Sequence, residues 1–440
     1  MAFELFIPRK IGSLGKVVTG KTPATTVSEN FDGPYPFITI PDLGGQQRIR
    51  KSARTLSEVG AKSQKTLLLP AGAVLMSCIA TVGKTGITTV PSFTNQQINA
   101  VICDETQVAP AYLYYAFSAL RPQLEDAGGG GSIYTNVSKS RFSDLTVYLP
   151  PTLAEQNAIA SVLGALDDRI ENLRATNETL EAIVQTLFKS WFVDFDPVKA
   201  KAAGKAPVGM DAETAALFPS EFEESELGLI PKGWAVCRVD QVAAMVKGKS
   251  YTSAELVDTN GTALVTLKSF KRGGGFRLDG FKPYAGKYKE EQVVIPGDLI
   301  VAYTDVTQAA ELIGRPAIVV GVDAYRTLVA SLDVGIVRPK FETMSRQFLK
   351  GLFSTPAFEY HTKARASGTT VLHLAKNAVE EFRFACPIDA LSQKFAEIAD
   401  PLSATVQRNI DEAYSFESLR DSLLPKLISG ELRLSEFGDD

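Results

Sequence analysis

The sequence has few of the residues that build disulfides, metal centres or membrane spans. Its four cysteines and two histidines are scattered, with no C-x-x-C pair and no zinc-ligand spacing: Cys78, Cys103, Cys237, Cys386, His361 and His373. We therefore expect reduced thiols, no metal site and a cytoplasmic protein. No apolar run reaches the about 18 residues that a membrane span needs. The N-terminal stretch MAFELFIPRK does not resemble a signal peptide.

Motifs of catalysis are missing as well. There is no N-P-P-Y or D-P-P-Y tetrapeptide of an amino-methyltransferase, no cofactor loop after a strand and no carboxylate–lysine cluster of a nuclease. Asp167 and Asp168 lie in a helical pattern, which predicts a solvated helix face rather than an acid–base pair. The sequence therefore predicts a protein without catalytic residues.

One stretch does match a phosphate-binding motif. Residues Gly15–Thr22 fit G-x-x-x-x-G-K-T, the phosphate loop of NTPases. Pro23 follows at once, however, and the related stretch Gly248-Lys249-Ser250 has Ala243 in place of the first glycine. We favour a turn whose amides touch a DNA phosphate, and nucleotide binding is the alternative.

A pattern of period 3.5 dominates the sequence between Leu153 and Val193. Its ten positions, which we call the seam, alternate in spacing between four and three, as in a coiled-coil helix: Ile159, Leu163, Leu166, Ile170, Leu173, Asn177, Leu180, Val184, Leu187 and Trp191. At about 1.5 Å per residue this helix would be about 60 Å long. Because one helix cannot bury its own seam, a partner helix is required.

The partner helix is expected near the C-terminus. Adding 236 to each seam position gives ten residues, eight of them apolar: Phe395, Ala399, Leu402, Val406, Asn409, Ala413, Phe416, Arg420, Leu423 and Leu427. If the helices run antiparallel with matched ends, the numbers of facing residues sum to 586. Asn177 then faces Asn409, and we predict a hydrogen bond between them that fixes the register. We also expect Arg420 to reach toward Asp167 or solvent, and a kink or break at Pro401 with Asp400 as an N-cap.

The rest of the chain is predicted to be an internal duplication. At a difference of 237, Lys139 aligns with Lys376, Pro150 with Pro387 and Gln156 with Gln393. The expected fold is mixed (α+β), with two duplicated α/β domains separated by two long helices that form an antiparallel coiled coil. The predicted segments are an α/β domain (1–152), a helical region (153–200), a linker (201–230), a second α/β domain (231–388), a second helical region (389–430) and a tail (431–440).

Charge is distributed unevenly along this order. Residues 1–150 carry 14 Lys and Arg against 10 Asp and Glu, and residues 231–388 carry 21 against 15, whereas residues 151–200 carry 4 against 8. Two basic domains beside an acidic helix predict binding of a polyanion such as double-stranded DNA. The candidate contacts are basic residues and amides of the kind that read adenine edges, although each could lie in an ordinary exposed loop: Arg48, Arg50, Lys51, Arg54, Asn95, Gln96, Lys268, Lys271, Arg272 and Arg277.

A second set of apolar residues repeats at a difference of 236 beside the seam. A two-helix coil leaves such flanking positions exposed, and an exposed apolar stripe usually marks an interface. We therefore predict that these residues bind two partner subunits, one near each end of the helix pair, while packing under the α/β domains is the alternative: Val162 with Ile398, Ile183 with Leu419, Phe188 with Leu424, and Phe192 with Ile428.

Three runs of the sequence resemble the specificity subunits of type I restriction–modification systems: LPPTLAEQNAIASVLGALDDRIENLRATNETLEAIVQTLFKSWFVDFDPVKAKAAG, ELGLIPKGWAV and SLRDSLLPKLISGEL. The resemblance covers the whole chain and implies two target-recognition domains, each reading one half of a bipartite DNA site. It further implies that the helices set the gap between the half-sites and hold two adenine methyltransferase subunits. Restriction subunits with translocase and nuclease activity would complete the complex. S-adenosylmethionine, ATP and Mg²⁺ would belong to these partners, and this chain would hold no cofactor.

Two other functional classes remain as alternatives. The Gly15–Thr22 match would suit a nucleotide-binding protein with a phosphate loop. A coiled-coil scaffold without DNA contact would leave both basic domains unexplained.

Overall fold

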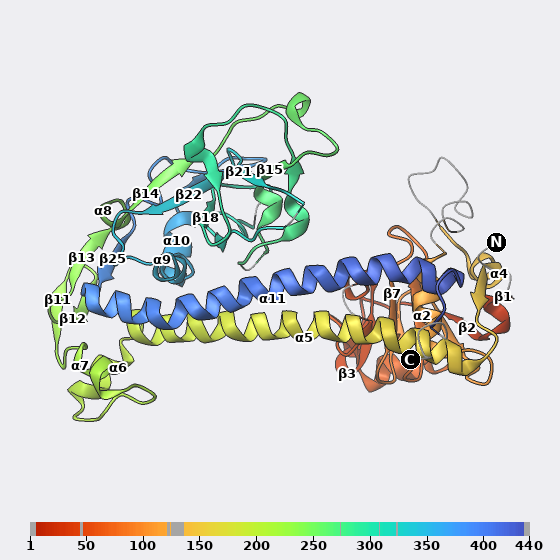
Figure 1. The fold of residues 1–440 in the computed structure, drawn as a ribbon. Helices are drawn as coiled ribbons and strands as arrows, with labels where there is room; N and C mark the ends of the chain where they lie inside the picture. The colour runs from red at the N-terminus through yellow and green to blue at the C-terminus, as the bar shows by residue number, and fades with distance from the viewer. Residues whose placement is uncertain are drawn as a thin grey trace, which may run out of the picture. The chain divides into compact units, whose positions relative to one another are not determined.

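The structure is a computed structural model that describes residues 6–44, 47–120, 124, 136–272, 274–307, 309–322 and 324–434 (Figure 1). Contacts within the chain divide it into two compact units. Unit 1 comprises Met1–Leu173 and Glu412–Asp440, and unit 2 comprises Arg174–Asp411. Each unit thus contains one α/β part and a segment of both long helices. In the described ranges, no helix is both long and apolar enough to cross a membrane.

The two long helices are α5 (Leu153–Phe192) and α11 (Asp389–Ser429), and each is continuous. Helix α5 begins at a capping box in which the hydroxyl of Thr152 donates to Glu155 and accepts from its backbone N–H. Helix α11 ends before Gly430, whose φ of 73° is the left-handed conformation that commonly terminates helices.

Within each unit, the helix segments pack along the predicted seam. Residues expected to face each other, with numbers that sum to 586, share a hydrophobic cluster: Ile170, Leu173, Ala413 and Phe416 in unit 1, and Trp191 with Phe395 in unit 2. The rings of the last pair lie 6.3 Å apart. The antiparallel register predicted from the sequence is therefore confirmed.

The predicted break at Pro401 is wrong, because α11 runs through this residue without interruption. Asp400 consequently lies inside the helix and is not an N-cap. Proline in a helix interior removes one backbone hydrogen bond and costs about 3 kcal/mol. Burial of the neighbouring Ala399 and of Phe395 one turn earlier keeps the helix packed at this point, while Pro401 itself is exposed.

The α/β part of unit 1 is built on three small sheets, ordered β2-β9-β6-β7-β4, β5-β3-β8 and β1-β10. Its elements are β1 (Ile7–Lys10), β2 (Gly15–Thr19), β3 (Phe31–Ile38), β4 (Arg48–Ile49), β5 (Thr55–Leu56), α1 (Glu58–Ser63), β6 (Val74–Ser77), β7 (Thr85–Thr88), β8 (Phe93–Thr94), β9 (Ile98–Cys103), α2 (Pro110–Ser118), α4 (Lys139–Asp144) and β10 (Thr146–Leu149).

Unit 2 repeats this plan with additions. Its sheets are ordered β14-β22-β18-β20, β16-β15-β21-β17, β19-β24-β23, β13-β25 and β11-β12. Its elements are α6 (Asp196–Ala202), α7 (Ala212–Ala216), β11 (Phe222–Ser225), β12 (Gly228–Pro231), β13 (Ala235–Arg238), α8 (Val239–Val242), β14 (Ala243–Lys247), β15 (Thr262–Val265), β16 (Lys282–Pro283), β17 (Val293–Val294), β18 (Leu299–Ala302), β19 (Thr304–Asp305), β20 (Pro316–Ile318), β21 (Thr327–Ala330), β22 (Val334–Pro339), α9 (Arg346–Phe353), α10 (Pro356–Lys363), β23 (Ala366–Ser367), β24 (Leu372–Leu374) and β25 (Arg383–Cys386).

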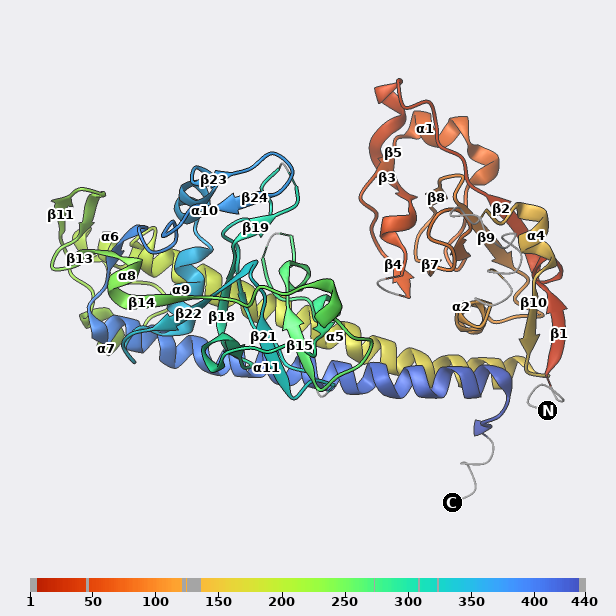
Figure 2. The same ribbon diagram turned by 90° about the horizontal axis from the view of Figure 1, so that it is seen from above.

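The strand pairing of the two units is equivalent and confirms the duplication. Strands β2 and β9 pair antiparallel with Gly15 opposite Cys103, and β14 and β22 pair with Ala243 opposite Pro339. The pairs β2–β9 and β14–β22 can be followed in Figure 2. Strands β6 and β18 are the next neighbours of β9 and β22, and all four residues of each are buried. These largely apolar strands form the centre of each α/β part.

Candidate nucleic-acid interface

The glycine–lysine motif belongs to the strand framework in both units. Gly15–Thr19 is strand β2, and the next elements are a short 3-10 helix (Ser28–Asn30) and β3, so the strand–loop–α-helix order of a phosphate loop is not present at this motif. The backbone N–H of Lys21 donates to Thr94, and that of Lys249 donates to Ala330. Since these amides are used internally, the expectation that they touch a phosphate is also wrong. The lysine side chains remain candidates for such contacts.

The two predicted amide readers of unit 1 are placed differently. Gln96 is exposed and accepts a hydrogen bond from the Thr22 hydroxyl at 2.7 Å. Asn95 is only 8% exposed, and its amide is bonded to the backbone and side chain of Gln97. The expectation that Asn95 presents its amide at the surface is therefore wrong, because this amide shapes the turn after β8.

The basic residues around β4 lie at the surface of unit 1. Arg48, Arg50, Lys51 and Arg54 are all exposed. The Arg48 guanidinium forms a 3.0 Å ion pair with Asp168 on α5. That of Arg54 lies over the Phe31 ring, 4.6 Å from its centre, beside a cavity of about 320 Å³. Such an arginine is held in place by the ring yet keeps its charge.

The basic stretch of unit 2 is also at the surface. Lys268, Lys271, Arg272 and Arg277 are exposed, and two of them are already paired with carboxylates. Arg272 contacts Glu311 at 3.1 Å, and Arg277 makes a bidentate pair with Asp279. A DNA phosphate could replace Glu311 or Asp279 as the partner of these arginines, because exposed ion pairs contribute little stability.

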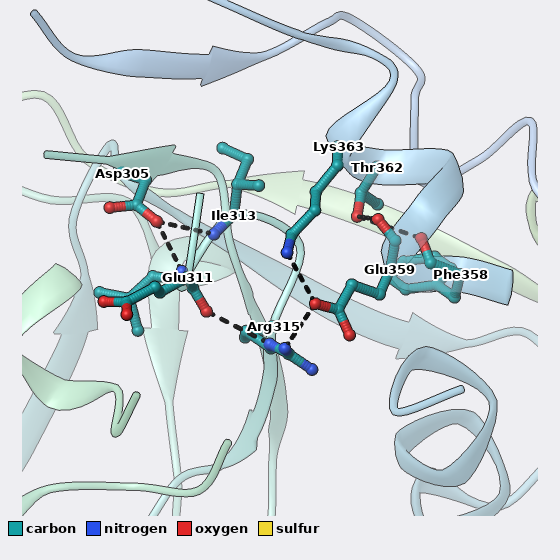
Figure 3. Close-up of polar contacts among 9 residues, drawn as sticks. Asp305, Glu311, Ile313, Arg315, Phe358, Glu359, Thr362 and Lys363 are labelled. Atoms are coloured by element: carbon teal, nitrogen blue, oxygen red, sulfur yellow. Dashed lines mark hydrogen bonds and ion pairs between the residues drawn. The ribbon is translucent and has the colours of Figure 1, made fainter. Parts of the chain in front are cut away.

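Sequence reasoning missed a structured loop in unit 2 between β19 and β20. It is built around the buried carboxylate of Asp305, and its later part is tied to α10 through Arg315 and Glu359 (Figure 3). The signal was the sequence Asp305-Val306-Thr307, because an aspartate often accepts hydrogen bonds from the residue two positions later.

The predicted partner-binding stripe divides into exposed and buried residues. Four positions are 36–48% exposed, and they form two of the predicted pairs: Val162 with Ile398 and Ile183 with Leu419. The expectation of exposure is wrong for Phe188, Phe192 and Ile428, which are less than 9% exposed, and Leu424 is only half-exposed and packs on the core of unit 1.

The burial of Phe188 has a clear cause in unit 2. Its ring lies against Gly351 of α9, where an added Cβ would be 2.4 Å from the ring. The rings of Phe348 and Phe395 lie 5.3 and 5.7 Å from it. The α/β part of this unit therefore covers the helix pair here, and this residue belongs to the hydrophobic core.

A polar layer interrupts the seam in each unit. In unit 2, Nδ2 of Asn409 donates to Oδ1 of Asn177 at 2.8 Å, so the predicted hydrogen bond is present. In unit 1, Asp167 accepts from Arg420 of α11 and from the hydroxyl of Tyr115 in α2, both at 2.7 Å. Asp167 thus joins both long helices to the α/β part of this unit.

The charges of this second layer are held in a partly buried site. Burial opposes the charge of Arg420, but its hydrogen bonds to Asp167 and Asp421 outweigh burial and raise its pKa. Burial and the bond to Asp167 raise the pKa of Tyr115, which stays protonated as a donor. These three side chains therefore hold the helices and the α/β part of unit 1 together.

The described residues hold no group of three or more potential metal ligands. All four cysteines are free thiols, and burial raises the pKa of Cys78 to about 11 and of Cys103 to about 12. Thiols of this kind are protonated and weakly nucleophilic at neutral pH.

Two equivalent α/β parts, each packed on an antiparallel helix pair and carrying exposed basic residues, define a duplicated protein with two candidate surfaces for a polyanion. A family model described as the type I restriction modification DNA specificity domain matches residues 5–182. The MjaIX specificity subunit of a type I restriction enzyme from Methanocaldococcus jannaschii is 27% identical over 98% of this chain and 94% of its own length. The HindI specificity subunit from Haemophilus influenzae is 34% identical over 38% of each chain. The crystal structure of a type I S subunit from M. genitalium has the same fold, with a TM-score of 0.55, 15% identity and 96% coverage of both chains. Residues 5–182 thus match a type I restriction modification DNA specificity domain, and the whole chain is similar in sequence and in fold to type I specificity subunits.

Proposed function

We propose that this chain provides the DNA-sequence specificity of a type I restriction–modification complex and carries no catalytic centre of its own. Each unit would contact one half of a bipartite site through its α/β part. The observation that carries this proposal is the equivalence of the two strand frameworks, which differ in the side chains that they expose. Two similar frames with different surfaces suit two unequal half-sites.

The spacing between the half-sites would follow from the helix pair. The seam residues and the Asn177–Asn409 hydrogen bond support one fixed register, because a slip would leave both amides unpaired. Helices α5 and α11, paired in this register, would set the length of the gap between the two half-sites.

Exchange of residues 1–152 for the equivalent part of another family member tests this proposal. With the methyltransferase partner present, sequencing of methylated adenines should show one altered half-site, one unchanged half-site and an unchanged gap. A change in both halves would contradict the assignment of one half to each unit. DNA retention by the complex should also fall steeply with salt concentration, as expected for phosphate contacts.

Docking of two methyltransferase subunits would use the four exposed apolar residues of the helix pair. Val162 and Ile398 are 36% and 38% exposed, and Ile183 and Leu419 are 48% and 45% exposed. These pairs repeat at a difference of 236, so each copy offers an equivalent apolar face to an equivalent partner. S-adenosylmethionine would bind to these subunits, and ATP and Mg²⁺ to restriction subunits in a complete cytoplasmic complex.

The combined variant Ile183→Glu with Leu419→Glu tests this docking surface. We expect loss of co-purification with the methyltransferase subunit while the circular dichroism of the chain is unchanged. Val208→Glu is the matched control, because Val208 is fully exposed and belongs to the connection between α6 and α7, not to either long helix. Equal co-purification of both variants would contradict the docking surface.

A further inference from the structure

The two units can be compared residue by residue where their backbone hydrogen bonds match. Gly83 donates to Ser77 in unit 1, and Gly314 donates to Ala302 in unit 2. The next residue in each unit accepts a hydrogen bond in return: the carbonyl of Lys84 from the N–H of Ser77, and the carbonyl of Arg315 from the N–H of Ala302. These bonds place Lys84 and Arg315 at equivalent positions, each at the end of a loop.

The loops that end at these positions differ in length. The preceding residues, Cys78 and Tyr303, are also equivalent, because their N–H groups donate to Gln97 and Asp333 in the matching turns. Five residues (79–83) separate the fixed points in unit 1, and eleven residues (304–314) separate them in unit 2. Unit 2 therefore carries an insertion of six residues in an otherwise shared framework.

The described residues of the inserted loop are held in one shape by Asp305, which is fully buried (Figure 3). One carboxylate oxygen accepts from the backbone and hydroxyl of Thr307, both at 2.8 Å. The other accepts from the backbone N–H groups of Leu312 and Ile313. Burial opposes the charge, but these hydrogen bonds lower the pKa of Asp305 overall, so it stays ionised. Ala310 has a φ of 50°, a left-handed conformation that a well-fixed loop imposes on a residue other than glycine.

Ion pairs connect the loop to the basic stretch and to α10. Glu359 accepts from Arg315 at 2.7 Å and Lys363 at 2.8 Å, so two cations share one carboxylate (Figure 3). Glu311 of the loop is paired with Arg272, which belongs to the basic stretch predicted to contact DNA. Glu311 and Glu359 are thus each paired with a cation, so neither presents uncompensated negative charge to a polyanion.

Beside the buried Asp305, the loop exposes an apolar side chain. Val306 is 65% exposed and follows Asp305 directly, so its backbone position is fixed by the hydrogen bonds described above. An apolar side chain that is exposed on a fixed backbone fits the major groove, where the C5-methyl group of thymine is the apolar base edge.

We infer that the segment Asp305–Thr307 of this loop contacts the DNA bases for unit 2, with Val306 against a thymine methyl group and Asp305 as its positioning residue. This inference rests on the proposed function. The insertion gives unit 2 a contact that unit 1 does not have in the same form, and so accounts for part of the difference between the two half-sites.

Val306→Glu in the complete complex with the methyltransferase subunit tests the inference. The carboxylate would face the DNA, and binding to the half-site of unit 2 should weaken about tenfold or more, the effect of a lost base contact. Ile295→Glu is the matched control, because Ile295 is 59% exposed in the turn that precedes β18, at the opposite end of this strand. The control should bind and methylate as the wild-type complex does.

A second measurement addresses the thymine contact itself. Replacing thymine by deoxyuridine in that half-site removes one methyl group and should weaken the wild-type complex about fourfold. Val306→Ala should bind both DNAs equally. Asp305→Asn should weaken the same half-site and speed hydrogen exchange of residues 305–315, with the other half-site unaffected.

The outcomes separate this inference from the proposed function. A wild-type complex without methylation at any bipartite site would refute the proposed function. A specific wild-type complex whose Val306→Glu variant binds as tightly as the Ile295→Glu control would refute only the role of the loop. Loss of a protein subunit from the Val306→Glu complex would also overturn it, in favour of a protein contact.

Discussion

The ion pair between Arg420 and Asp167 offers a sharp test of how unit 1 is held together. Among the described residues, Arg420→Leu would leave Asp167 with the Tyr115 hydrogen bond alone, although the Arg420 and Asp167 side chains are just 28% and 15% exposed. Removing one partner of a fully buried pair costs about 3–5 kcal/mol, and removing an exposed partner costs about 0.2–1 kcal/mol. Because this pair is partly buried, we expect Arg420→Leu to lower the free energy of local opening by about 2 kcal/mol, a roughly 30-fold change in the opening equilibrium.

Arg169 provides a matched control for this prediction. It pairs with Glu412 at the same 2.7 Å distance and between the same two helices, but the side chains are 52% and 41% exposed. Arg169→Leu should therefore cost less than about 1 kcal/mol. Hydrogen exchange of the unit 1 segments of α5 and α11 measures both values as local opening free energies.

Adding Asp167→Leu to the Arg420→Leu variant should restore most of the lost stability. A partly buried ion pair replaced by packed apolar side chains is often neutral or stabilising, whereas a lone carboxylate is not. The remaining deficit would be the lost Tyr115 hydrogen bond, about 1 kcal/mol. Equal costs for Arg420→Leu and Arg169→Leu, or a double variant worse than the sum of its parts, would refute this reasoning.

Three further predictions concern α11 and unit 2. Asn177→Leu and Asn409→Leu should each cost stability alone, and together they should be favourable, with a coupling of about 1 kcal/mol in a double-mutant cycle followed by hydrogen exchange. Pro401→Ala should stabilise α11 by about 1–3 kcal/mol, because it restores a backbone hydrogen bond at an exposed position, and slower exchange around residue 401 would show it. Burial lowers the pKa of His361, so stability should fall as the pH drops below the unfolded value of about 6.5; thermal melts should show this slope, and His361→Gln should flatten it.

The helix pair was predictable because its information is periodic and local. A period of 3.5 over ten positions specifies a helix, and the constant difference of 236 specifies its partner and register. The same pattern could not decide which flanking residues are covered. Phe188 and Ile183 look alike in sequence, but only Phe188 meets a glycine of α9, and that contact depends on tertiary packing.

The candidate interface was less predictable because exposure and hydrogen bonding decide it. The exposed arginines and lysines were identified from composition, since such residues are rarely buried. Asn95 was misjudged because an amide that shapes a turn has the same sequence signal as an amide that reads a base. The inserted loop went unnoticed because its length is an insertion only relative to the shared hydrogen-bond framework, which no sequence pattern reports.

The two units show why a duplicated specificity protein keeps its framework while its contacts diverge. Backbone hydrogen bonds such as Gly83 to Ser77 and Gly314 to Ala302 do not depend on the side chains that they connect, so the strand frame persists as the sequence changes. Side-chain links diverge instead: the positions equivalent to Asp167 and Arg420 in unit 2 are Ser403 and Val184, which cannot form an ion pair. The frame thus holds each reading surface in the same way, and the surfaces are free to differ. A protein that reads two unequal half-sites needs this combination, because a change in one reading surface then leaves the other half-site and the gap unaffected.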